Sequence, residues 1–273
     1  MARVDVHHTT TTITLSVRLL GRLSVHIAER PVRISGRQAQ ALLALLVLRP
    51  RSRTREAIAT DLWPDAATGS TGSLRQALWL VRSAIAGTGV DPDRVIESDA
   101  DSVGLRPEVC LEHDAAEFET LVRSRPARPE EALHVYRGEL AEGFAHECFA
   151  RERERLADLY EDALALAADS RLARGDLDGA RGSALELLGR DPLREEAHQI
   201  LIRVYGASGS RSQVLRQFRR LEALLAGEIG EEPLPETIET YRAAMAAAVI
   251  RSRRRVAAST FRPEPHLAFA ASS

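Results

Sequence analysis

The sequence contains no lysine, so all 37 of its basic residues are arginine. A nucleotide-binding phosphate loop needs a lysine that reaches the phosphates, and a pyridoxal enzyme needs one for its Schiff base. Both kinds of site are therefore excluded. No nucleophile–base pair or carboxylate dyad stands out either, and we predict that the protein is not an enzyme.

Cysteine and long apolar runs are scarce too. Cys110 and Cys148 are the only two cysteines, and their spacing fits neither a metal site nor a redox motif. The apolar run ALLALLVL at 41–48 is too short to span a bilayer, and the first residues lack the apolar core of a signal peptide. We expect a cytoplasmic, nucleoid-associated protein with no membrane partner, no metal and no cofactor.

Charge is distributed unevenly along the chain, although the formal net charge is only −2. Residues 1–90 carry 12 arginines against five acids, a net of +7, which leaves −9 for residues 91–273. A basic module followed by an acidic one is typical of a protein whose N-terminal part meets an anionic partner.

The sequence of the N-terminal module predicts strands, then three helices, then a hairpin. Apolar and polar residues alternate from Ile13 to Ile34, which predicts short antiparallel strands. A first helix follows, capped by Ser35 and stopped at Pro50. Thr54 then caps a second helix that stops at Pro64. A third helix is predicted from GSTGSLRQALWLVRSAI (69–85), and a hairpin is predicted from RVIESDADSVGLRP (94–107). This order is that of a winged helix–turn–helix over residues 13–107.

The third helix carries an unusual polar face. Its apolar residues Leu74, Leu78, Val81 and Ile85 recur at helical spacing, and the opposite arc holds arginines, a glutamine and Trp79 without any acid. Such side chains can pair with base edges in the major groove. The alternative is that Trp79 packs on a neighbouring domain and the arginines are solvated. We predict that the residues reading bases are Ser73, Arg75, Gln76, Trp79 and Arg82, and that those contacting the DNA backbone are Arg51, Arg53, Thr54 and Arg55.

From residue 111 onward the pattern is helical throughout. Residues 167–192 align with 201–226 at an offset of thirty-four, with Gly175 on Gly209 and Ala180 on Val214. That offset is the length of a tetratricopeptide repeat (TPR). The fold class is therefore predicted to be mainly α: an α+β winged helix followed by an all-α, TPR-like domain over 111–248 and a disordered tail over 249–273.

Both halves resemble one family. From about Leu15 to Met245 the chain resembles the Streptomyces antibiotic regulatory protein (SARP) family. The resemblance is carried by VRLLGRLSV, by SLRQALWLVRSAI and above all by DPLREEAHQILIRVYGASGSRSQVLRQFRRL. The resemblance implies an OmpR-like winged helix joined to a bacterial transcriptional activator domain. It further implies an activator of a specialised-metabolite (antibiotic) gene cluster, whose protomers bind side by side on direct repeats near a promoter and contact RNA polymerase holoenzyme, including its sigma factor.

One feature departs from the pattern expected for DNA binding, and alternative functions stay open. The predicted wing turn carries Glu97, Asp99 and Asp101 where a basic residue would suit DNA phosphates, so no base contact is assigned to it. The alternative function is a TPR-like scaffold or adaptor that binds peptide partners and uses its winged helix only for protein contacts. A small-molecule sensor that uses a cavity of the repeats is a third option.

Overall fold

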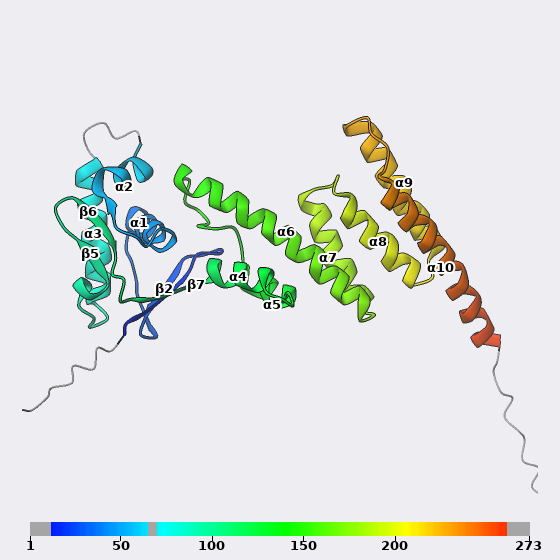
Figure 1. The fold of residues 1–273 in the computed structure, drawn as a ribbon, viewed down its shortest axis with the longest axis horizontal. Helices are drawn as coiled ribbons and strands as arrows, with labels where there is room; N and C mark the ends of the chain where they lie inside the picture. Colours follow the sequence, from blue (N-terminus) through cyan, green and yellow to red (C-terminus); the bar gives the residue numbers. More distant parts are fainter. Residues whose placement is uncertain (1–11, 65–69, 261–273) are drawn as a thin grey trace, which may run out of the picture. The chain divides into compact units, whose positions relative to one another are not determined.

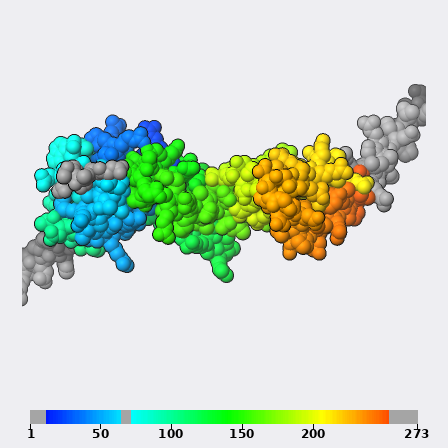
Figure 2. Space-filling model, turned by 90° about the horizontal axis from the view of Figure 1, so that it is seen from above, coloured from blue at the N-terminus to red at the C-terminus, as the bar shows by residue number. Residues whose placement is uncertain are grey.

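The computed structural model describes residues 12–64 and 70–260. The chain divides into two compact units, Met1–Ala163 and Leu164–Ser273, each of which is described by itself below. In Figures 1 and 2 the colours follow the sequence, so the first unit runs from blue to green and the second from green to orange. The division falls within a helix, whereas the predicted domain boundary lies near residue 110.

The first unit begins with a four-stranded sheet in the order β3-β2-β1-β7. Its strands are β1 (Thr14–Arg18), β2 (Ser24–Ile27), β3 (Arg30–Pro31) and β7 (Cys110–His113). The antiparallel strands predicted between 13 and 34 are confirmed: Leu15 lies opposite Ile27, and both are buried. Strand β7 pairs in parallel with β1, although the sequence assigns most of β7 to the helical domain.

Helix α1 (Arg37–Leu48) follows, and its cap differs from the prediction. The N-cap is Gly36 at a φ of 86°, without a side-chain hydrogen bond, so the assignment of Ser35 was wrong. A φ of this sign suits glycine and redirects the chain just before the helix, which leaves Ser35 one position too early. The apolar run of α1 is buried and packs against α3 (Ser70–Ala86).

The helix–turn–helix consists of α2 (Arg55–Leu62) and α3. The hydroxyl of Thr54 accepts a hydrogen bond from the backbone N–H of Ala57 (3.2 Å), which confirms the predicted N-cap. The wing is the hairpin of β5 (Ile96–Ser98) and β6 (Ser102–Leu105), preceded by the short helix η1 (Pro92–Arg94). Strand β4 (Arg53–Thr54) completes a second sheet in the order β4-β6-β5. The predicted winged helix is confirmed.

Further helices close the first unit: α4 (Asp114–Arg123), α5 (Pro129–Val135), the short η2 (Glu147–Phe149) and α6 (Ala150–Ala173), which continues into the second unit. The buried carboxylate of Asp114 accepts hydrogen bonds from the backbone N–H groups of Leu19 (2.7 Å) and Leu20 (3.1 Å). Desolvation raises the pKa of Asp114 above its ordinary value. The first sheet and α4 are thus joined by a charge-assisted contact.

The second unit is helical and contains α7 (Leu177–Arg190), α8 (Glu195–Ala207), α9 (Arg211–Glu228) and α10 (Pro235–Thr260). Ala180 and Val214, the aligned positions of the two repeats, are both fully buried. Gly175 and Gly209 both take a φ of 80° in the turns between helices. The TPR-like fold predicted for this half is confirmed.

Helix α10 replaces the first part of the predicted tail. Residues 249–260 continue the helix instead of leaving it, because alanine and arginine have high helix propensity even without an amphipathic pattern. The remainder of the predicted tail, 261–273, lies outside the described residues. None of the helices described is long and apolar enough to cross a membrane.

Candidate nucleic-acid interface

Helix α3 presents two distinct faces. Leu74, Leu78, Val81 and Ile85 are buried, at 0–6% exposure, and this face packs on α1 and α2. Trp79 on the other side is 65% exposed. The predicted division of the helix is therefore confirmed, and an indole that would gain from burial lies in contact with solvent.

The predicted base-reading residues differ in what they bind within the protein. Arg75 and Gln76 are exposed and have no hydrogen-bond or ion-pair partner among the described residues. Arg82 is instead engaged: its Nη2 lies 2.8 Å from the carboxylate of Asp93 in η1. Ser73 is half-buried near the start of the helix. Arg75, Gln76 and Trp79 thus form the part of the face that is open to a partner.

The predicted backbone-contacting residues lie around the start of α2, and most of them are already bound. Arg53 forms an ion pair with Asp61 (2.7 Å), and the hydroxyl of Thr54 is used as a cap. Arg51 is exposed. A DNA phosphate could approach Arg51 directly, whereas it would have to share Arg53 with Asp61.

Arg55 has a role that sequence reasoning missed. Its Nε donates to the backbone oxygen of Asp99 (3.0 Å), and its Nη2 donates to the hydroxyl of Ser98 (2.9 Å). Its backbone N–H also donates to the oxygen of Asp101 (2.9 Å). Arg55 therefore holds the wing turn against the start of α2. The sequence shows an arginine before a helix but no sign of this distant partner.

One acid of the wing turn, Asp99, has a structural role. One carboxylate oxygen of Asp99 accepts hydrogen bonds from the backbone N–H groups of Asp101 (2.8 Å) and Ser102 (2.7 Å). These bonds lower the pKa of Asp99 below its ordinary value and close the turn, as aspartate commonly does. The acid at this position thus shapes the wing.

Within the described ranges, no group of three histidine, cysteine or carboxylate side chains could hold a metal ion. The fold and the face of α3 define a winged-helix protein joined to a module of helical repeats. Residues 111–245 match the bacterial transcriptional activator domain, and this part of the chain belongs to that family. This match supports the resemblance to the SARP family and a transcriptional activator of that type.

A solved structure shares the fold. It is Mycobacterium tuberculosis EmbR in complex with a low-affinity phosphopeptide, with 24% identity and a TM-score of 0.69, covering 91% of this chain and 70% of that one. No curated protein gives a significant match.

Proposed function

We propose that the chain binds promoter DNA by inserting α3 into the major groove. Support comes from one observation: Arg75, Gln76 and Trp79 lie exposed on one face, and the arginine and the amide have no partner within the described residues. Arginine pairs bidentately with the O6 and N7 of guanine, glutamine with the N6 and N7 of adenine, and an apolar ring packs on a thymine methyl. Ser73 and Arg82 flank these three residues on α3. Arg82 contacts DNA in this proposal after its ion pair with Asp93 is broken.

Backbone contacts would come from the start of α2. Arg51 is exposed there, and the N-terminal N–H groups of the helix favour a phosphate. Thr54 remains the helix cap beside that phosphate. Arg53 is shared between the phosphate and Asp61. Arg55 contributes through the wing that it holds.

The helical repeats supply the activating part of the proposal. Residues 111–245 match an activator domain, and the proposed partner is RNA polymerase holoenzyme with its sigma factor. Protomers would lie side by side on direct repeats, in the cytoplasm at the nucleoid, and control a specialised-metabolite gene cluster. Transcription in vitro tests recruitment: on a template that carries the binding site, the protein should increase the transcript made by purified holoenzyme.

DNA binding is tested by selecting duplexes from a random pool and measuring their affinity by fluorescence anisotropy. Affinity should fall steeply with salt because phosphate contacts release counterions. Arg75→Ala should weaken binding roughly 5- to 150-fold, as expected for a base contact worth about 1–3 kcal/mol. Arg219→Ala, at an exposed arginine of α9, is the control and should change little. No enriched duplex, or affinity insensitive to salt, would favour the scaffold alternative.

A further inference from the structure

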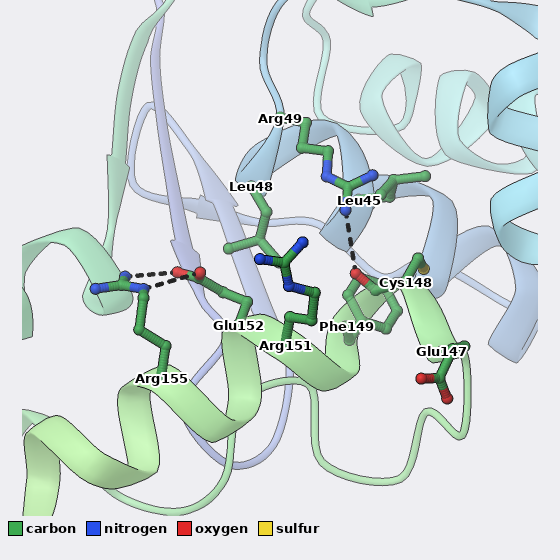
Figure 3. Close-up of a pocket in the computed structure, with 9 residues that line it drawn as sticks. All are labelled: Leu45, Leu48, Arg49, Glu147, Cys148, Phe149, Arg151, Glu152 and Arg155. Atoms are coloured by element: carbon green, nitrogen blue, oxygen red, sulfur yellow. Dashed lines mark hydrogen bonds and ion pairs between the residues drawn. The ribbon is translucent and has the colours of Figure 1, made fainter.

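A cavity of about 410 Å³ lies within the first unit, outside the DNA-reading face. It opens between the end of α1 on one side and η2 with the start of α6 on the other (Figure 3). Its volume falls within the range of small-ligand sites. The lining residues are Leu45, Leu48, Arg49, Glu147, Cys148, Phe149, Arg151, Glu152 and Arg155.

Two guanidinium groups supply the charge of this cavity. Figure 3 shows the side chains of Arg49 and Arg151 reaching toward one another from opposite walls. Arg49 is held in place by an ion pair to Asp61 (2.8 Å) and a hydrogen bond to the backbone oxygen of Cys148 (3.3 Å). Arg151 is exposed, and none of the described residues forms an ion pair or hydrogen bond with it.

The carboxylates of the lining do not neutralise this pair. Glu152 is bound by Arg155, whose Nη2 and Nε lie 2.7 Å and 3.0 Å from its two oxygens. Glu147 points away from Arg49 and Arg151 in Figure 3. Asp61 is shared by Arg49 and Arg53, and Arg151 has no acidic partner among the described residues, so the positive charge at the cavity exceeds the negative charge. This excess favours an anion that bridges Arg49 and Arg151.

Apolar side chains form the rest of the wall. Leu45 and Phe149 are almost fully buried, and Leu48 is half-buried beside Arg151. A purely inorganic anion would leave the exposed part of Leu48 in contact with water, whereas an apolar group on the ligand would cover it. The guanidinium fork matches both carboxylate and phosphate oxygens.

We propose that this cavity binds a small oxyanion that carries an apolar group, with its charge between Arg49 and Arg151 and its apolar part against Leu48. The site lies close to the helix–turn–helix. Asp61 of α2 pairs with both Arg49 (2.8 Å) and Arg53 (2.7 Å), so one shared carboxylate connects the cavity to a residue proposed to contact DNA.

The test is calorimetric titration of the full chain, without DNA, with phenyl phosphate and with phenylacetate. At least one should bind saturably at one site per chain, and the tighter of the two identifies phosphate or carboxylate as the preferred head group. Inorganic phosphate should bind more weakly, because it lacks the apolar part.

Substitutions then locate the site. Arg151→Gln should weaken binding of the tighter probe about tenfold, the loss of one charge-assisted hydrogen bond. Because Arg151 is exposed and has no partner among the described residues, this change should leave the fold intact. Leu48→Gln should weaken the aromatic probes but not inorganic phosphate, and Arg137→Gln, at another exposed arginine of the unit, should change nothing. Absence of saturable binding, or binding that Arg151→Gln leaves unchanged, overturns the proposal.

Discussion

Trp79 is the residue at which stability and DNA affinity should separate. At 65% exposure its indole fills no cavity, so Trp79→Ala should leave the thermal unfolding midpoint nearly unchanged. On the proposed function, the same change removes an apolar contact with a base and lowers affinity for the selected duplex, by a few-fold to about a hundredfold. Anisotropy titrations and thermal melts of the two proteins measure both effects.

Fluorescence gives an independent reading of the same residue. With Trp63 replaced by phenylalanine, Trp79 is the single indole, and acrylamide should quench it readily in the free protein. Binding of the duplex should then shield it. Equal quenching with and without DNA, at saturating duplex, would show that Trp79 lies outside the interface.

His198 should make the second unit sensitive to acid. The ring is fully buried: its Nε2 donates to the backbone oxygen of Pro192 (3.0 Å), and its Nδ1 accepts from the amide of Gln217 (2.8 Å). Burial lowers the pKa of His198 below its ordinary 6.5. The unfolded chain therefore takes up the proton first, and the free energy of unfolding should decrease as pH falls below about 6.5.

Urea unfolding at about pH 7.5 and about pH 5.5 measures this loss. His198→Gln is expected to lower the free energy of unfolding at both pH values, since it disturbs the two hydrogen bonds. It should also reduce the difference between the free energies of unfolding at the two pH values. His134→Gln, at an exposed histidine of α5, should leave that difference unchanged. A residual slope is expected from His113 and His146, whose pKa values burial also lowers. An unaltered slope in His198→Gln would show that this ring does not govern the acid response.

Among the elements, helices α8 and α10 cross in close contact. A Cβ added at Gly206 would lie 2.8 Å from the Cβ of Ala244 and 2.9 Å from its Cα. Gly206→Ala should therefore force the helices apart and cost about 1–3 kcal/mol of unfolding free energy. Chemical denaturation of the full chain measures the change.

Gly182 of α7 is the matched control. A Cβ there would meet nothing within 4 Å, so Gly182→Ala should stabilise the helix by roughly 0.5–1 kcal/mol through its higher helix propensity. Opposite signs for the two substitutions are the expected outcome. If both stabilise the protein, the close contact of α8 and α10 does not exist in solution.

The elements also show what the sequence can and cannot predict. Helical spacing was enough to divide α3 into a buried face and an exposed one, because burial follows the 3.6-residue period. It could not predict that Arg55 holds Asp99, since their contact joins α2 to a turn 44 residues away. The pairing of Arg82 with Asp93 was missed for the same reason, and so was the parallel partner that β7 finds in β1.

For the whole molecule, the proposed arrangement on DNA makes a geometric prediction. If protomers bind side by side on direct repeats, their contacts depend on both sites facing the same side of the duplex. Inserting about 5 base pairs between the repeats rotates one site by half a helical turn, and inserting about 10 restores its orientation. The half-turn insertion should therefore abolish cooperative binding, and the full-turn insertion should recover part of it.

Gel-shift titrations of the selected site with each insertion measure this dependence, and a duplex with a single repeat supplies the intrinsic affinity. Arg75→Ala should weaken binding to the single repeat and to both repeats in parallel, because it acts on base contacts within each protomer. Spacing should instead change only the ratio of second to first binding, because it acts on contacts between protomers. If the overall association constant for two sites equals the square of the single-site constant at every spacing, the protomers bind independently. In that case side-by-side assembly would be wrong even with α3 in the groove.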